Sequence, residues 1–594
     1  MDRLFNPHTE IPRPQPEDAR ISLQRRREPW HEDRRGSTKP LIAVSILILI
    51  CSYLFFLQLG KLALTDPDET FYAETAREML AKGEWVTPYL YGKPQFEKPI
   101  LFYWLVEASF KAFGVNEFAA RFPSAVLGTA GVIAIFFLGS VLFNRRAGFL
   151  SALILATNVE YIVLSRACIT DMALFVFMEL AVLFFFCGYI KEKGYFYLLS
   201  SASIALATLT KGPVYLALFG AAIFAFLLFA KDLKALKRMP LWQAALVFIV
   251  VSMPWYMAIY RLHGRAFMDG FFGLHNVTRF LVSEHKIGSQ AYYNIPVILG
   301  GIFPWSIFLP AGFWHIFSKI RGQSTEYRVQ STEADNRKKG SIFVLAWFFV
   351  IFGFFTVSST KLPTYIFPSF VSLAVIIGVL LDDFLKGEVS GSIAKITMLS
   401  YYILAAILLL GWVGAAIYAK LDFPSILTGI IISGLFLAFG GLLSLITFIN
   451  KRFAPAFALV AYSVVIFLCP LSALVLPEVE RYETSKEVSA KLSVIMKPGE
   501  ELGAASNYVP GLAFYTGKFP VDLDRHHIQI SFMNSEKRVW AVMKEKNHKH
   551  LYDREITKAY VKPSYVVFNI GKRAIITNEV PSDGRFLVKR ERQQ

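Results

Sequence analysis

The sequence has little cysteine and little charge for its length. Four of its 594 residues are cysteine, and they lack the spacing of a metal site or a disulfide framework. Charged residues make up 18% of the chain. The sequence also shows no internal repeat, no low-complexity tract and no cleavable signal peptide. These absences exclude a cysteine-based scaffold and a repeat array. They also predict that the first apolar run, starting near residue 41, stays as an anchor.

Apolar residues, in contrast, are abundant. The chain is 54% hydrophobic and 15% aromatic, with a mean hydropathy of +0.44. Apolar runs of about 20 residues recur along it, which is the length that crosses a bilayer. This pattern predicts a polytopic α-helical membrane protein in contact with membrane lipids. The formal net charge of +17 would also suit nucleic acid. The basic residues, however, lie mainly in short loops and in the tails, so we expect no nucleic-acid partner.

Thirteen membrane spans are predicted from these runs. They cover residues 40–60, 122–143, 147–165, 171–190, 195–210, 213–230, 241–260, 291–317, 341–358, 362–382, 398–419, 424–449 and 454–476. Basic clusters such as "KDLKALKR" (231–238) fall on one side of the membrane if the count is right, and the positive-inside rule makes that side the cytoplasm. We therefore expect residues 1–39 in the cytoplasm and a transmembrane domain at 40–476. The 61–121 loop is expected on the outer, periplasmic side.

Residues 477–594 have a different composition. They are polar and of mixed charge, with short β-like runs at 538–543, 565–570 and 585–590. About 118 residues suffice for one small soluble domain. The sequence predicts an α/β domain here, and an odd number of spans places it in the periplasm.

The first outer loop carries the most informative polar residues. Asp66, Asp68 and Glu69 follow the first span directly, and a helix is predicted after them with an apolar face and a charged face at 72–80. The run 98–114 is apolar but too short to span easily, so both helices are expected to lie in the interface. The turn between them, "GKPQFEKP" (92–99), holds Glu97 and Lys98. From chemistry alone, a solvated loop and a catalytic loop explain these charges equally well.

Several motifs in chain order resemble a known family. They are "DPDETFYAETAREMLAKGEWVTPYLYGKPQFEKPILFYWLVEA", "FGVNEFAAR", "TDMAL" (170–174), "TKGP" (210–213), "HNVTRF" (275–280), "AYY" (291–293) and "TKLPTYIFP" (360–368). Together they resemble the aminoarabinose lipid A transferases, which are lipid-linked sugar transferases of the GT-C fold related to protein O-mannosyltransferases. The ordered set spans about residues 60–370, and the thirteen-span plan extends it to the whole chain.

The resemblance implies a glycosyltransferase that moves a sugar from a polyprenyl-phosphate donor to lipid A or another envelope acceptor. The reaction would take place at the periplasmic face of a bacterial inner membrane. Asp68 matches the functional carboxylate of the family, with Glu69 and Asp171 as further catalytic candidates. A helix N-cap is the structural alternative for Asp68. A hydroxyl acceptor would need Asp68 as a base, whereas a phosphate acceptor would need it only to orient or stabilise.

Cations are expected to hold the donor phosphate, because negative charge grows on it as the sugar leaves. The predicted donor phosphate-binding residues are the four cations Lys98, Lys211, Arg279 and Lys361, together with Tyr365. For any single lysine, snorkelling to the interface is the alternative. Glu97 and His275 resemble the metal pair of the family and would suit a divalent ion such as zinc. Direct contact of His275 with the phosphate is the other reading.

Two departures leave the sugar open. Phe71 stands where the aminoarabinose enzymes commonly have arginine, and Leu274 stands where glutamate normally precedes the histidine. Galacturonic acid, galactosamine and other lipid-linked sugars are therefore equally compatible. A protein O-glycosyltransferase would share Asp68 and the fold. A transporter or flippase is disfavoured, because transporters often show repeats and carry their ionisable groups near the midplane, whereas these residues gather at one edge.

Overall fold

The computed structural model describes residues 39–278, 290, 292–322, 332–544, 546–547, 564–571 and 573–579, with the side chains of 39, 274–278, 332–334 and 481–483 left out. The chain divides into two units, residues 1–46 and residues 47–594, and the second contains the features that follow. Arg279 and the predicted strand at 585–590 lie outside the described residues.

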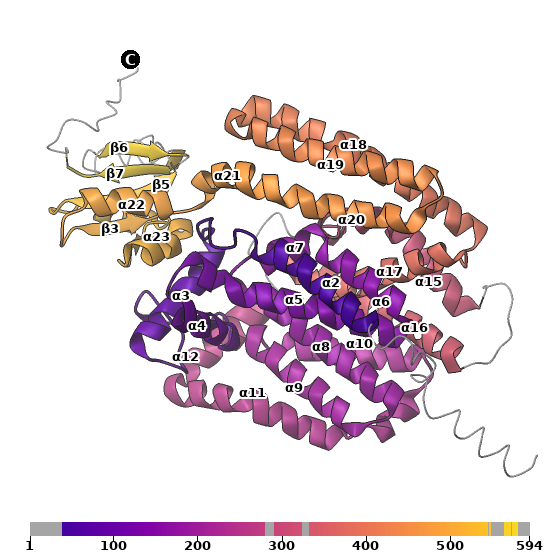
Figure 1. Ribbon diagram of the computed structural model, residues 1–594. Coiled ribbons are helices and arrows are strands. Elements are labelled where there is room, and N and C mark those ends of the chain that lie inside the picture. The colour runs from indigo at the N-terminus through magenta and orange to yellow at the C-terminus, as the bar shows by residue number, and fades with distance from the viewer. Residues whose placement is uncertain are drawn as a thin grey trace, which may run out of the picture. The chain divides into compact units, whose positions relative to one another are not determined.

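Long apolar helices make up most of the second unit (Figure 1). Those before residue 280 are α2 (Lys39–Phe56, shared with the first unit), α5 (Glu117–Leu142), α6 (Arg145–Ala156), α7 (Val159–Ser165), α8 (Thr170–Lys191), α9 (Gly194–Lys211), α10 (Val214–Phe229) and α11 (Leu241–His263). Later come α14 (Asn294–Gly301), α15 (Leu309–Arg321), α16 (Thr332–Val357), α17 (Phe370–Lys386), α18 (Gly391–Asp422), α19 (Leu427–Ile449) and α20 (Phe453–Pro470).

Small residues let neighbouring helices approach closely. A Cβ added at Gly139 of α5 would lie 2.7 Å from the Cα of Gly148 in α6. Such contacts replace hydrophobic burial as the source of packing between helices in lipid. Asparagine caps begin three of these helices: the side chains of Asn116, Asn144 and Asn158 accept from the amides of Ala119, Ala147 and Tyr161, respectively.

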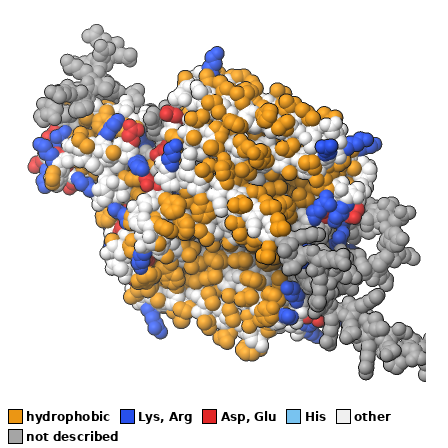
Figure 2. Space-filling view, viewed as in Figure 1, with side chains coloured by type: hydrophobic (Ala, Val, Ile, Leu, Met, Phe, Trp, Pro, Cys, Tyr) orange, Lys and Arg blue, Asp and Glu red, His pale blue; other side chains and the backbone are white. Residues whose placement is uncertain are grey.

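Each predicted span coincides with a helix or a bent pair of helices. By length and composition, eight described helices qualify as spans, and ten do if each bent pair is one span. The chain is thus a multi-pass membrane protein, and the count of thirteen stays a prediction. One predicted span is not straight: α14 and the helices that follow it bend by 113° within 291–317. On the face shown in Figure 2, charged side chains gather at two ends of a broad apolar surface.

The C-terminal region contains a five-stranded sheet in the order β4-β3-β5-β7-β6. Its elements are α21 (Leu476–Glu483), α22 (Lys486–Ile495), β3 (Glu501–Ala504), α23 (Val509–Thr516), β4 (Val521–Asp522), α24 (His526–Met533), β5 (Val539–Lys544), β6 (Tyr565–Ile570) and β7 (Arg573–Thr577). Strand β3 pairs in parallel with β4 on one side and with β5 on the other. Strand β7 pairs antiparallel with β5 and β6. Helices α22 and α23 cover one face and α24 the other. The predicted α/β fold and two of its strands are confirmed.

The 61–121 loop, predicted on the outer side, folds as α3 (Asp68–Lys82), a hairpin of β1 (Tyr89–Leu90) and β2 (Lys93–Pro94), and α4 (Leu101–Phe113). The charged face of α3, which was predicted on a helix lying in the interface, is buried by protein. Glu74 is fully buried and Glu78 is 5% exposed. The reason is that α3 packs against α4 on one side and against α23 of the C-terminal region on the other (Figure 1).

Hydrogen bonds from neighbouring residues satisfy these carboxylates. Arg77 donates to both oxygens of Glu74 at 2.7 and 2.8 Å and also to the Ala513 carbonyl of α23 at 3.3 Å. The Glu78 carboxylate accepts from the Tyr91 and Gly92 amides at 2.5 and 2.9 Å. The charged face of α3 is therefore an interface that fixes the helix against its neighbours.

Candidate active site

Asp68 is the first residue of α3, and it is the exposed member of the carboxylate group at this helix end. Surrounding protein still desolvates its carboxyl group, which raises the pKa of Asp68. The negative charges of Asp171 and Glu69 raise it further, and the Lys211 ammonium opposes them. The structure thus brings four predicted site residues within electrostatic range of one another.

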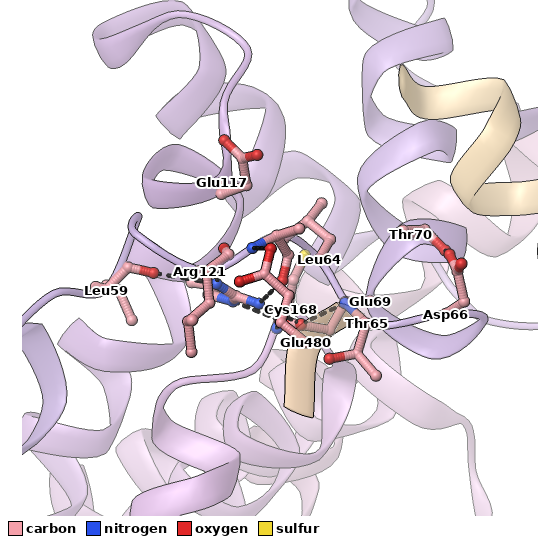
Figure 3. A network of polar contacts seen from close by, with 12 residues as sticks. Leu59, Leu64, Thr65, Asp66, Glu69, Thr70, Glu117, Arg121, Cys168 and Glu480 are labelled. Atoms are coloured by element: carbon pink, nitrogen blue, oxygen red, sulfur yellow. Dashed lines mark hydrogen bonds and ion pairs between the residues drawn. The ribbon is translucent and has the colours of Figure 1, made fainter. Parts of the chain in front are cut away.

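Glu69, next along the helix, is held in a buried clamp (Figure 3). Arg121 of α5 donates to its two oxygens at 2.8 and 2.6 Å. The amides of Thr65 and Cys168 donate to the same carboxylate at 2.9 and 2.8 Å. Burial alone would raise the pKa of Glu69, but the Arg121 guanidinium outweighs it and the pKa is lowered.

Arg121 also binds the chain that leads from the first span to α3. Its remaining N–H groups donate to the carbonyl oxygens of Leu59, Leu62 and Ala63 at 2.7–3.1 Å. All five guanidinium donors therefore have acceptors. These contacts make Glu69 and Arg121 the pair that fixes the position of Asp68. A catalytic role for Glu69 itself stays a prediction.

Asp171 and Lys211 form a second ion pair on the membrane side of Asp68. Asp171 lies in the first turn of α8 and Lys211 is the last residue of α9, so two neighbouring helices contribute. Their side chains are 9% and 8% exposed, and Lys211 Nζ lies 2.5 Å from Asp171 Oδ1. The same ammonium lies 5.3 Å from the centre of the Tyr365 ring. Three residues from distant parts of the sequence are thereby joined, as the motifs predicted.

Lys361 is 4% exposed, in the segment between α16 and the short helix that begins at Pro363. No described residue forms an ion pair or hydrogen bond with its ammonium group. An isolated buried ammonium is costly, so such a group is normally paired or placed to receive a charged ligand.

Glu97 and Lys98 are half-buried in the turn that precedes α4. Phe96 beside them packs on His263 and Phe267 and lies against Gly270, at the start of the helical segment Met268–Thr278. The turn with Glu97 and the segment with His275 are thus neighbours. The side chain of His275 and all of Arg279 lie outside the described residues. Among those described, no group of three or more metal-ligating side chains occurs. The Glu97–His275 metal pair stays a prediction.

Asp66 lies two residues before Asp68, and Figure 3 shows its side chain beside Thr70, apart from the Glu69–Arg121 pair. The solvated-loop alternative is wrong for Asp66. Its side chain is 1% exposed and lies 3.7 Å from Arg573 of β7, and the Ser485 hydroxyl donates to it. A Cβ at Gly511 of α23 would overlap its carboxylate. Asp66 therefore joins the outer loop to the C-terminal region.

Sequence reasoning assigned no role to Arg121 or Arg573. Arg121 belongs to the motif "FGVNEFAAR", so a signal for it was present. Nothing in the sequence near Arg573 pointed to a residue some 500 positions away. Contacts of this range depend on tertiary packing, which a single sequence without an alignment does not reveal.

Comparisons with known proteins bear on the family. The profile of the dolichyl-phosphate-mannose-protein mannosyltransferases matches residues 97–257. An undecaprenyl phosphate-α-4-amino-4-deoxy-L-arabinose arabinosyl transferase of Yersinia enterocolitica is 28% identical over 382 residues, covering 62% of this chain and 66% of the relative. An uncharacterized protein of Aquifex aeolicus is 29% identical over 82% of this chain and 87% of its own length.

Among solved structures, the crystal structure of ArnT from Cupriavidus metallidurans bound to undecaprenyl phosphate has a TM-score of 0.74 to this chain, at 20% identity. The match covers 92% of this chain and 99% of that one. The chain has the GT-C fold and resembles the aminoarabinose lipid A transferases. The apo form of ArnT gives the same TM-score of 0.74 over 90% of this chain. The predicted resemblance, fold and glycosyltransferase class are confirmed.

Proposed function

We propose that this GT-C chain transfers a sugar from a polyprenyl-phosphate donor to lipid A or another envelope acceptor, at the periplasmic face of a bacterial inner membrane. The observation that carries the proposal is an exposed carboxylate, Asp68, within electrostatic range of the buried Asp171–Lys211 pair at the ends of two membrane helices. The names of the aminoarabinose transferases that the chain matches, which include undecaprenyl phosphate, support the donor class.

The donor phosphate is assigned first to Lys361. Its buried ammonium has no anionic partner among the described residues, and a phosphate is the anion that this reaction would bring. Lys211 is assigned as the second contact. One of its three N–H donors faces Asp171, which leaves two for a phosphate oxygen. Tyr365, beside Lys211, adds a hydroxyl donor. Both lysines lie at ends of apolar helices, so the prenyl chain would extend into the bilayer.

The reaction breaks the bond between the anomeric carbon and the phosphate oxygen, and the electron pair stays on the polyprenyl phosphate. Lys361 and Lys211 stabilise the negative charge that grows there. The acceptor oxygen forms the new bond to the anomeric carbon, which has oxocarbenium character in between. If the acceptor is a hydroxyl, Asp68 takes its proton. If the acceptor is an ionised phosphate, Asp68 orients it and stabilises the positive sugar.

The Glu69–Arg121 clamp would fix the position of Asp68 relative to the donor. Position matters because misplacement of a catalytic group by about 1 Å can lower the rate roughly a hundredfold. A metal at Glu97 and His275 would supply positive charge at the leaving phosphate, and no step above depends on it. Phe71, in place of the arginine common in aminoarabinose enzymes, packs edge-to-face on Tyr72. Because Phe71 replaces that arginine, galacturonic acid, galactosamine and other lipid-linked sugars are as compatible with the site as aminoarabinose. A protein O-glycosyltransferase remains the second candidate, because it would share Asp68 and the fold.

Mass spectrometry of lipid A from a deletion strain tests the proposal. Loss of one sugar mass increment, restored by the wild-type gene and not by an Asp68→Asn gene expressed equally, is the expected result. An Asp524→Asn gene, which changes an exposed aspartate of the C-terminal region, is the matched control and should restore the sugar. Unchanged lipid A together with loss of glycan from envelope proteins would favour the protein O-glycosyltransferase instead.

A further inference from the structure

A cavity lies beside the turn at Asp66 and Pro67. Its volume is about 410 Å³, within the range of ligand pockets. Four parts of the chain line it: the turn at Asp66 and Pro67, the end of α18 with the segment after it, α21, and the C-terminal sheet region. The mechanism proposed above uses none of these residues.

One wall of this cavity is polar, and its side chains contact one another. Arg573 is 2% exposed, lies 3.7 Å from Asp66, and its guanidinium lies 4.5 Å from the centre of the Tyr508 ring. Asn507 and Lys544 are exposed at the rim. The charges of Asp66 and Arg573 largely offset each other, so the cavity is not built as a simple anion site.

The opposite wall is apolar and comes from membrane helices. Tyr418, which is 57% exposed, lies near the end of α18. Phe423 and Ile426 follow in the connection to α19, and all three line the cavity. Flat aromatic faces combined with amide, carboxylate and cationic groups suit a saccharide, whose ring faces are apolar and whose edges carry hydroxyls. A site at the end of membrane helices suits a saccharide that belongs to a lipid.

We propose that this cavity binds the saccharide headgroup of the acceptor glycolipid. The inference rests on the proposed function. Lys211, a predicted donor contact, pairs with Asp171, whereas Asp66 contacts Ser485 and Arg573 of the C-terminal region. Pro67, which lines the cavity, directly precedes Asp68, the carboxylate that would act on the reactive oxygen of the acceptor. The C-terminal region thus contributes one wall of the acceptor site.

The test measures binding and kinetics separately. The probe is the deacylated, water-soluble saccharide of lipid A, added to the full-length protein in nanodiscs and followed by ligand-observed NMR. The double variant Tyr418→Ala/Lys544→Ala is expected to weaken probe binding about fivefold or more, the size of the loss of one or two polar contacts. In transfer assays the same variant should raise KM for the acceptor and leave KM for the donor unchanged.

Matched controls replace exposed residues of the same types elsewhere. Tyr402→Ala lies on the same helix, and Lys518→Ala lies in the same C-terminal region; both should bind the probe like the wild type. The proposal is overturned if the wild type does not bind the probe, if the double variant binds it as well as the controls do, if inorganic phosphate displaces it, or if only KM for the donor changes. Because binding is measured without transfer, failure of the glycosyltransferase proposal would show in the transfer assay alone.

Discussion

Replacing Arg121 with lysine should loosen the loop that carries Asp68. Arg121 uses five N–H donors, two to Glu69 and three to backbone carbonyls of the chain before α3. Lysine keeps the charge but has three donors, so at least two of these hydrogen bonds are lost. A hydrogen bond to a charged group contributes about 1.5–3 kcal/mol. The expected destabilisation of the protein is therefore about 3 kcal/mol or more.

The measurement is thermal unfolding of the purified protein in detergent, together with the transfer rate at a temperature where the variant is folded. Arg121→Lys should lower the Tm and also slow transfer, because Asp68 loses its fixed position. Arg238→Lys is the control: it changes an exposed pair with Glu192, whose side chains are 66% and 73% exposed. An Arg121→Lys protein with wild-type Tm and wild-type rate would refute the claim that this clamp positions the catalytic carboxylate.

Three further predictions follow from the same geometry. Asp68→Asn should lower the transfer rate by about a hundredfold or more. Because the pKa of Asp68 is raised, the wild-type rate should rise with pH along an acid limb that lies above the usual aspartate pKa. pH–rate profiles of both proteins test this. The pKa of Glu69 is lowered, so its stabilisation is present above the unfolded value near 4.3 and is lost as the pH falls through the folded pKa, which acid unfolding measures. Single cysteines at the exposed positions Lys93 and Lys518, in a background without native cysteines, should react with an impermeant thiol reagent in intact spheroplasts, whereas one at Lys234 should react only after lysis.

The apolar helices could be predicted from the sequence because apolar length is a local property. Helices α9 and α10 were expected as two short spans between 191 and 230, and they are separate helices. The C-terminal sheet could be predicted from short β-like runs for the same reason. The ordered motifs assigned Asp171, Lys211 and Tyr365 to one site, and in the structure Lys211 contacts the other two.

The roles of the remaining polar residues could not be predicted. Glu74 and Glu78 share a polar helix face in the sequence, yet both are buried. Arg77, the partner of Glu74, contacts α23 from the far end of the chain, and the turn at Tyr91 and Gly92 binds Glu78. Asp66 resembled a loop charge for the same reason, since Ser485 and Arg573 come from the C-terminal region. Helical periodicity shows which residues share a face, but it does not show which partner covers that face.

The central claim is that donor binding and catalysis reside in different groups, Lys361 for the carrier phosphate and Asp68 for the transfer step. Direct binding of a polyprenyl-phosphate analogue to purified, folded variants tests it. Lys361→Ala should weaken binding roughly ten- to a hundredfold, the effect of one charge-assisted contact. Lys420→Ala, which changes an exposed lysine in the last turn of α18, should bind like the wild type. Asp68→Asn should bind the analogue as tightly as the wild type or slightly more tightly, because a negative charge near the phosphate is removed. Wild-type affinity in Lys361→Ala together with loss of the lipid in Asp68→Asn would contradict the account.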